Sequence, residues 1–365
     1  MTEPAPQAVE LIRVRLPLVR PFTTSFGTTA VKEAILVRAI GGDGAEGWGE
    51  SVAMEHPLYS GEWNDGAWLV LRDYLAPAAV AGWPAGIQGH AMARAAVEVA
   101  LVDLRLRREG IPLAAHLGGV RDRVPCGVSL GLEEDLDDLL ELVGRFVDAG
   151  YRRVKLKIEP GRDLDVVRAV RASFPEVPLS ADANAAYTEE TAGMLPALDE
   201  LGLEYLEQPL PEDDLLGHAR LQQRMATPVC LDETITSPAV ARNAIELGAC
   251  RVINVKLGRV GGLAASVAIH DLARQAGVPL WCGGMLETGV GRAANVALAA
   301  MPGFTLPGDT SASDRYFERD LTDPFVVEPD GTMRVPEGPG IGVEPLPQAL
   351  QEAAVDRLTV RRAGG

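Results

Sequence analysis

The chain has 365 residues, more than one hydrophobic core usually supports, so we expect two domains. Its 47% hydrophobic and 23% charged residues are typical of a soluble globular protein, and no segment is apolar for long enough to span a bilayer. The net charge of −17 disfavours nucleic acids and anionic membranes as partners, because both attract basic surfaces.

The cysteines and histidines disfavour two kinds of site. The four cysteines are widely spaced and form no CxxC pair, and the five histidines form no HxxxH pair. This excludes the usual disulfide frameworks and thiolate zinc sites, so any metal should have oxygen ligands. Residues 1–10 contain no basic stretch followed by an apolar one, and we therefore expect a cytoplasmic protein.

The first third of the chain is α+β in character. Short alternating runs, Leu11–Leu18 and Ala34–Ile40, are separated by turn-rich stretches such as Gly41–Gly44. Apolar residues then recur at helical spacing over Met92–Arg107. We predict that residues 1–122 form an α+β capping domain.

From Val124 onward, apolar strands alternate with amphipathic helices. The expected strands are Val124–Leu130, Arg153–Ile158, Leu179–Asp182, Tyr205–Glu207, Val229–Leu231, Val252–Lys256, Leu280–Cys282 and a weaker one at Phe304–Leu306. The expected helices include Leu164–Ser173, Thr191–Leu201, Ala239–Leu247 and Leu263–Gly277. This pattern predicts an α/β fold, a modified (β/α)₈ barrel, over residues 123–325. Residues 326–365 form a C-terminal segment whose tail packs back on the first domain.

Ionisable residues recur at the ends of five successive strands. Lys157, Asp182, Glu207 and Asp232 follow one another at intervals of 25 residues, and Lys256 comes 24 residues later. This interval is one strand–helix unit, so all five side chains should meet at the rim where active sites of this fold lie.

The three carboxylates predict a metal site. Asp182, Glu207 and Asp232 on adjacent strands would repel one another without a cation, and oxygen ligands suit Mg²⁺, with Mn²⁺ or another divalent metal as a substitute. Asn184 could orient water or substrate, and Glu233 is expected behind the ligands, paired with a lysine.

The two lysines predict acid–base chemistry. Only four of the 34 basic residues are lysine, and three of these four fall at this site. Lys157 and Lys256 end the second and sixth strands, on opposite walls of a barrel, so each can reach one face of a substrate carboxylate's α-carbon. Lys155, as a second ammonium, should help Lys157 to lose its proton. A simple salt bridge from Lys155 to a carboxylate ligand is the alternative, and the two are compatible. Arg259 could do the same for Lys256, although a surface loop position is the expectation that we favour.

Two other classes of function remain open. A desolvated lysine also forms Schiff bases with carbonyl substrates, which would make the protein a lyase of that type. A barrel without catalysis could instead serve as a binding or assembly protein.

Several motifs resemble those of the enolase superfamily, in its muconate-lactonizing-enzyme subgroup. They are Val154–Gly161, Asp182–Asn184, Glu207–Pro209, Asp232–Thr234, Asn254–Gly262, Trp281–Gly289 and Leu306–Ser311. Within the subgroup the chain looks most like o-succinylbenzoate synthases that also act as N-succinylamino acid (N-acylamino acid) racemases.

The resemblance implies Asp182, Glu207 and Asp232 as metal ligands and Lys157 and Lys256 as the acid–base pair. It implies that the substrate, a small carboxylate, loses its α-proton to give a stabilised enediolate. Positions that match substrate contacts, or for the aromatic ones core packing, are Ser129, Gly284, Met285, Phe22, Phe26, Met54 and Tyr59. A homo-oligomer is expected.

The resemblance implies racemisation, or the dehydration that forms o-succinylbenzoate in the menaquinone pathway. The alternatives within the subgroup are a cycloisomerase and a dipeptide epimerase. The segment around Asp309 lacks the Asp-x-Asp of dipeptide epimerases, and strand six ends in Lys256 rather than in the histidine base of mandelate racemase relatives. Arg259 resembles racemase-competent members.

Overall fold

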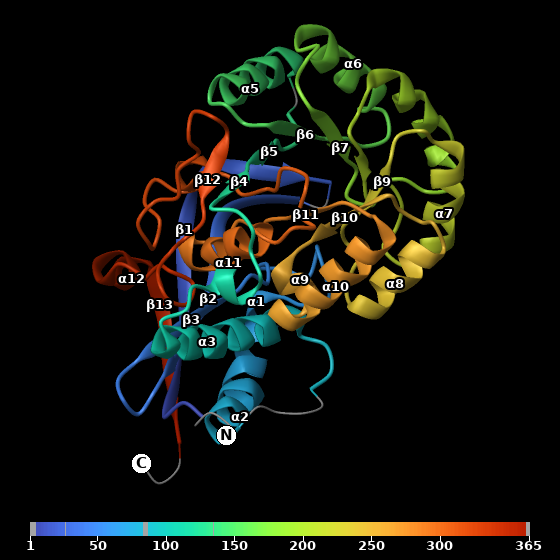
Figure 1. Ribbon diagram of the computed structural model, residues 1–365. Coiled ribbons are helices and arrows are strands. Elements are labelled where there is room, and N and C mark those ends of the chain that lie inside the picture. Colours follow the sequence, from blue (N-terminus) through green and yellow to red (C-terminus); the bar gives the residue numbers. More distant parts are fainter. Residues whose placement is uncertain (1–4, 26, 83–86, 134, 363–365) are drawn as a thin grey trace.

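We describe the fold from a computed structural model, which covers residues 5–25, 27–82, 87–133 and 135–362. Figure 1 shows two parts, a ring of helices around a curled parallel sheet and, beside it, a long antiparallel sheet with its own helices. In the described part of the chain, no helix combines the length and the apolarity needed to cross a membrane.

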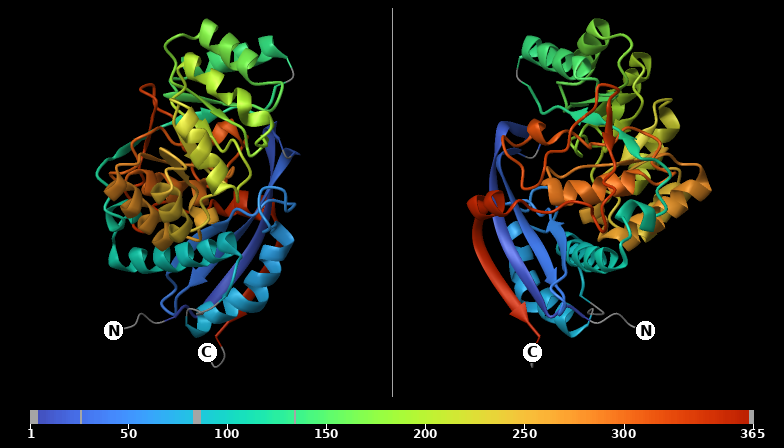
Figure 2. Two further views of the ribbon diagram at one scale, coloured as in Figure 1. Left: turned by 90° about the vertical axis from the view of Figure 1, so that its right-hand side faces the viewer. Right: turned by 60° about the vertical axis from the view of Figure 1, so that its left-hand side comes forward.

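The antiparallel sheet has the strand order β13-β1-β2-β3. Its strands are β1 (Ala8–Thr24), β2 (Gly27–Ile40), β3 (Glu46–Ser51) and β13 (Ala354–Arg361), and the helices nearby are α1 (Asn64–Val70), η1 (Leu71–Leu75), α2 (Ala76–Ala81) and α3 (Ala91–Glu109). The last strand of the chain therefore pairs with the first, antiparallel, at the sheet edge that Figure 2 shows on the outside of the molecule.

Both faces of this sheet are buried, and strand alternation explains why. Val9 and Leu11 of β1 pack with the capping domain's own helices, whereas Ile12 and Val14 belong to the core that continues into the barrel. Because neighbouring side chains of a strand point to opposite faces, one strand supplies both cores. The sheet thus joins the two parts into one packed unit.

Glycine allows β3 to approach α3 closely. A β-carbon on Gly47 or Gly49 would collide with the backbone of α3, at Ala100 O and Ala96 O respectively. Any larger residue at these two positions would push the helix away from the sheet. The close packing sets the position of α3, which lies against the barrel on its other side (Figure 1).

The parallel sheet has seven strands in the order β11-β10-β9-β8-β7-β6-β5. They are β5 (Gly127–Ser129), β6 (Arg153–Lys157), β7 (Leu179–Asp182), β8 (Leu206–Glu207), β9 (Val229–Leu231), β10 (Val252–Val255) and β11 (Leu280–Cys282). The surrounding helices are α5 (Leu136–Asp148), α6 (Leu164–Ser173), η2 (Thr191–Leu201), α7 (Leu215–Arg224), α8 (Pro238–Glu246), α9 (Leu257–Val260), α10 (Leu263–Ala276) and α11 (Gly289–Ala299). The expected modified barrel is confirmed.

Side-chain caps start several of these helices. Asp135, Asp163, Asp214, Ser237 and Thr288 each accept a hydrogen bond from a backbone N–H of the first turn. Such a cap satisfies a donor that has no partner within the helix. The caps fix where each strand–helix loop ends, and these loops surround the rim of the barrel.

The ring closes without an eighth regular strand in the described residues. The predicted strand at Phe304–Leu306 is reduced to isolated parallel bridges, Leu280 to Phe304 and Cys126 to Gly308, which link β11 to the start of β5. The predicted strand Val124–Leu130 is also divided. Its first part is β4 (Arg123–Pro125), which pairs with β12 (Thr332–Arg334) outside the ring.

The predicted helix Thr191–Leu201 is a 3₁₀ helix. Pro196 lies inside it, lacks a backbone N–H and cannot donate the hydrogen bond of a regular α-helix. The segment nevertheless buries Leu195 and Leu198, so it fills the place of a barrel helix.

Candidate active site

The five ionisable residues of the sequence pattern lie at one rim of the parallel sheet. Lys157 stands beside Asp182 in the register of β6 and β7, and Asp182 beside Glu207 in that of β7 and β8. Asp232 directly follows β9 and Lys256 directly follows β10. The strands end in step because they are parallel and of similar length, so the side chains converge as predicted.

Each wall of the rim holds a lysine against a carboxylate. Lys157 Nζ donates to Asp182 Oδ2 over 2.7 Å and to Asn184 Oδ1 over 2.5 Å. On the other side, Lys256 Nζ lies 2.9 Å from Asp232 Oδ2. Asn184 also donates to Glu233 Oε1 over 2.9 Å, so one amide links a lysine to the carboxylate beyond the central acids.

Lys155 is held by three carboxylates. Its Nζ lies 2.7 Å from Glu207 Oε2, 3.0 Å from Asp309 Oδ2 and 3.4 Å from Asp182 Oδ2. The expected salt bridge to a candidate ligand is therefore present. Burial acts to lower the pKa of Lys155, but Asp309 and Glu207 outweigh burial and raise that pKa above its ordinary value.

Asp309 is a site residue that our sequence reasoning missed. It accepts from Arg153 Nη2 over 2.8 Å and from Ser129 Oγ over 3.0 Å, in addition to its contact with Lys155. Its position shortly after the weak eighth strand, comparable to that of Asp232 after β9, was the available signal. Because Asp309 contacts Ser129 at the end of β5, the charged groups of the rim extend to that strand.

Burial and mutual repulsion act on the carboxyl groups. Burial raises the pKa of Glu207, and the charge of Asp182 raises it further. The same two causes, in the same order, raise the pKa of Glu233. Burial also acts to raise the pKa of Asp182, but the charges of Lys157 and Lys155 outweigh it and keep this pKa below its ordinary value.

The donor set fits a hard divalent cation. Asp182, Glu207 and Asp232 are at most 1% exposed and supply only oxygen atoms. Glu233 Oε2 accepts no hydrogen bond from the described part of the chain, and a cation would relieve the repulsion among these acids. Among the residues that the structure describes, no three His, Cys, Asp or Glu side chains stand close enough together to hold a metal ion as they are placed.

Arg259 corrects one expectation. We favoured a surface position for this residue, but it is 4% exposed. Its guanidinium donates to Ile235 O over 2.9 Å and to Asn254 O over 2.7 Å, and it forms an ion pair with Asp232. Arg259 is buried because its guanidinium meets acceptors on Ile235, Asn254 and Asp232, and it shares Asp232 with Lys256.

Tyr59 of the capping domain contacts Arg259, Asp232 and Lys256 of the barrel. Its hydroxyl accepts from Arg259 Nη1 over 2.9 Å and donates to Asp232 Oδ1 over 3.3 Å. Lys256 Nζ lies over its ring, 4.6 Å from the centroid. Although burial acts to lower the pKa of Lys256, Tyr59 and Glu233 lead the groups that raise it above its ordinary value.

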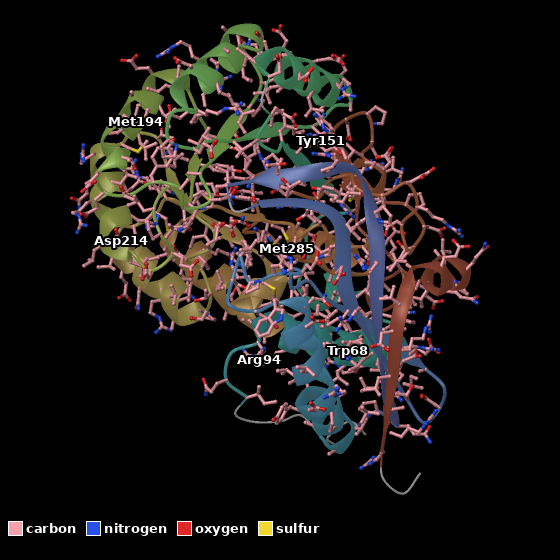
Figure 3. All side chains as sticks on the ribbon, turned by 180° about the vertical axis from the view of Figure 1, so that it is seen from behind. Trp68, Arg94, Tyr151, Met194, Asp214 and Met285 are labelled. Carbon is pink, nitrogen blue, oxygen red and sulfur yellow. The ribbon has the colours of Figure 1, made fainter. Side chains whose placement is uncertain are left out.

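A cavity of about 160 Å³ lies between the two domains above this rim. Its wall includes Lys155, Lys157 and Lys256 and most of the expected substrate positions, namely Phe22, Met54, Tyr59, Ser129, Gly284 and Met285. Phe26 lies outside the described residues. Figure 3 shows Met285 near the centre of the molecule, where the barrel meets the strands of the cap.

Lys32 is a second residue that our sequence reasoning did not place in the site. It comes from β2, is 4% exposed, and lines the same cavity. Its Nζ donates to the backbone carbonyl of Met285 over 3.0 Å. Its rarity as one of four lysines was the only sequence signal.

Two family models match most of the chain. The model described as "Mandelate racemase / muconate lactonizing enzyme, N-terminal domain" matches residues 8–118, and the model described as "Enolase C-terminal domain-like" matches residues 138–349. Both matches fall on the parts that the fold separates.

Curated relatives match over nearly the full length. An N-succinylamino acid racemase from Amycolatopsis sp is 52% identical, covering 96% of this chain and 98% of that relative. An o-succinylbenzoate synthase from Geobacillus kaustophilus is 51% identical, covering 97% of this chain and 94% of that relative.

Solved structures share the fold. An enolase superfamily protein from Listeria innocua is 39% identical with a TM-score of 0.93, over 98% of this chain and 99% of that one. A muconate lactonizing enzyme from Pseudomonas fluorescens, complexed with muconolactone, is 27% identical with a TM-score of 0.90, over 96% of this chain and 99% of that one.

Proposed function

The chain belongs to the mandelate racemase and muconate lactonizing enzyme family of the enolase superfamily, and from this premise we propose a reaction for its site. The protein is an enzyme that removes the proton next to a carboxylate of a small molecule. It acts as an N-succinylamino acid racemase, as an o-succinylbenzoate synthase, or as both. Relatives with these two names share about half of its residues over nearly its whole length.

The observation that carries this proposal is the placement of Lys157 and Lys256. They end β6 and β10, which lie four positions apart in the sheet order, and both line the same cavity. Asp182, Glu207 and Asp232 end the strands between them or directly follow these. A substrate above the acids is thereby reached by an amine from either side.

The three acids are the proposed ligands of a divalent metal, which enzymes of this superfamily use, and Mg²⁺ is the metal that we propose. When bound, the metal offsets the negative charge that the substrate carboxylate gains as the proton leaves. Asn184 holds Lys157 at the rim, and Arg259 with Tyr59 surrounds Lys256.

In racemisation, one lysine takes the α-proton as a neutral amine and the other returns a proton from its ammonium to the opposite face. In dehydration, one lysine serves as base and then as acid on a single face, while the other stabilises charge. Lys155 stays positively charged between Glu207 and Asp309, so it attracts the developing negative charge without exchanging a proton.

The capping domain closes the cavity around the rest of the substrate. Phe22, Met54 and Tyr59 form its wall on the cap side, and Ser129, Gly284 and Met285 form the barrel side near the acyl group. A β-carbon on Gly284 would lie 3.0 Å from Asp309 O, so a larger residue would narrow this end.

We place the enzyme in the cytoplasm as a homo-oligomer. The four cysteines, Cys126, Cys230, Cys250 and Cys282, are all free and buried, which suits a reducing compartment. Large apolar side chains such as Leu69 and Tyr74 are exposed on the cap helices and offer a surface for a second copy.

Incubation with Mg²⁺ in deuterated water tests the reaction. Proton NMR should show loss of the α-proton of N-succinylamino acids, conversion of the hydroxylated precursor to o-succinylbenzoate, or both. If neither exchange nor turnover occurs, the proposed function is wrong. A covalent adduct trapped by borohydride would instead support the Schiff-base alternative, which the pairing of both lysines with carboxylates argues against.

A further inference from the structure

Lys32 is a buried cation in the wall of the substrate cavity. It comes from β2 of the capping domain and is 4% exposed. One of its ammonium hydrogens is used by the carbonyl of Met285, at 3.0 Å. Because an ammonium has three hydrogens to donate, two donors remain for other acceptors.

Lys32 forms no direct ion pair with a carboxylate in the described part of the chain. Glu33 is paired with Arg15, with 3.0 Å between Oε1 and Nε. Glu50 accepts from the backbone N–H groups of Thr288 and Gly291, at 3.1 and 2.9 Å, and so faces α11.

Glu287 is the other acid near Lys32. Its Oε1 accepts from Met285 N over 2.8 Å, which holds it to its own loop. Burial lowers the pKa of Lys32, and the charges of Glu50, Glu287 and Glu33 oppose this effect. These acids favour the ammonium from a distance without satisfying its donors.

An ammonium buried without a direct counterion is costly, which favours an anionic ligand group at this point. The other three lysines of the cavity wall, Lys155, Lys157 and Lys256, are each paired with carboxylates of the rim. Within the described residues that line the cavity, Lys32 is thus the lysine left to meet an anion from the substrate. It lies beside Met285, at the end of the cavity proposed for the acyl group.

The substrates of both proposed reactions share a group of this charge. An N-succinylamino acid carries a succinyl chain that ends in a carboxylate, and so does the hydroxylated precursor whose dehydration gives o-succinylbenzoate. In both substrates this carboxylate is distant from the carbon that loses its proton. We propose that Lys32 binds this terminal carboxylate, so that the capping domain selects substrates with an anionic acyl chain. This inference rests on the proposed function and adds a specificity-determining residue to it.

The test compares two acyl chains of equal length on the same amino acid, N-succinyl and N-butanoyl, of which only the first carries the distal charge. Lys32→Met removes the cation and keeps an unbranched side chain, and Lys32→Arg restores a cation. The ratio of kcat/KM for the succinyl over the butanoyl substrate should fall about 10- to 100-fold in Lys32→Met, which corresponds to losing a charged hydrogen bond. Lys32→Arg should recover a large part of it.

The butanoyl substrate also reports whether the variant is folded and active. If Lys32→Met lowers kcat/KM equally for both substrates, or for neither, the proposal is overturned and Lys32 only supports the Met285 loop. If wild-type enzyme turns over neither N-acylamino acid, the racemase part of the proposed function fails separately from the subsite. The subsite is then judged by calorimetric binding of o-succinylbenzoate against o-butanoylbenzoate, where the same loss of preference in Lys32→Met is expected and its absence refutes the subsite.

Discussion

Arg259 of the barrel donates a 2.9 Å hydrogen bond to the hydroxyl of Tyr59 in the capping domain. The same guanidinium pairs with Asp232, and the Tyr59 ring lies under the ammonium of Lys256. The surroundings of Lys256 are therefore assembled from both domains, whereas Lys157 is held by the barrel residues Asp182 and Asn184.

Because of this difference, we predict that Arg259→Met slows exchange of one substrate enantiomer much more than exchange of the other. Losing the guanidinium should displace Lys256 and Asp232, and small displacements of a catalytic group reduce rates by about 100-fold. In deuterated water, exchange of the enantiomer that Lys256 deprotonates should slow by about 10- to 100-fold. Exchange of the other enantiomer should slow much less. Tyr59→Phe is the milder comparison, because it removes a neutral hydroxyl with its two hydrogen bonds and leaves the charges of Arg259 and Asp232 in place. Equal slowing of both enantiomers in Arg259→Met would contradict the asymmetry.

Replacing either lysine should slow α-proton exchange in one enantiomer of the substrate and leave exchange in the other. Lys157→Arg and Lys256→Arg keep a positive charge but remove a base that can become neutral. Each variant should lose exchange of one enantiomer by roughly 10²- to 10⁴-fold, the usual contribution of an acid–base group. Proton NMR of each enantiomer in deuterated water measures this. If either variant abolished exchange of both enantiomers alike, Lys157 and Lys256 would not act from opposite sides.

Metal removal should affect activity and stability together. Asp182, Glu207 and Glu233 repel one another in a buried rim, so a bound cation stabilises the folded state. Dialysis against EDTA should abolish exchange and lower Tm, and adding Mg²⁺ should restore both. Glu207→Gln should bind Mg²⁺ more weakly in calorimetry. An unchanged Tm together with full activity in EDTA would exclude the metal site.

Asp309→Asn should destabilise the fold strongly. Asp309 neutralises Arg153 and Lys155, which are at most 2% exposed, and leaving buried charges without their partner costs about 3 to 5 kcal/mol. Glu352→Gln breaks the exposed pair with Arg319 and should cost about 1 kcal/mol or less. Urea unfolding measures the free energy of unfolding of both variants. A similarly small loss of stability in Asp309→Asn would show that other acids are enough to neutralise Arg153 and Lys155.

The sequence predicted the rim of the barrel because one spacing encoded it. Lys157, Asp182, Glu207 and Asp232 each end a repeating unit of equal length, and parallel strands of a barrel end on one side. This prediction needed no knowledge of side-chain packing, because the spacing in the sequence and the common direction of the strands place these residues at one rim. The same reasoning did not identify Asp309, because the sequence before it has only a weak strand pattern. In the structure that segment forms only isolated bridges.

Contacts between the domains were beyond this reasoning. The predicted domain bounds place Lys32 in the capping domain, but nothing in the sequence relates that part of the chain to the loop that carries Met285. Arg259 was expected at the surface because a charged residue in a loop usually lies there. Its burial depends on acceptors from three separate segments, at Ile235, Asn254 and Tyr59, which only the folded chain brings together.

The pairing of β1 with β13 has a consequence for biosynthesis. β1 spans Ala8–Thr24 and is synthesised more than 300 residues before β13, which spans Ala354–Arg361. Until then, the outer edge of β1 lacks its partner strand, and an open edge is a template for pairing with another chain. Completion of the capping sheet therefore waits until β13 has been synthesised, and a nascent chain that stalls before β13 exposes a strand edge that can pair with another chain.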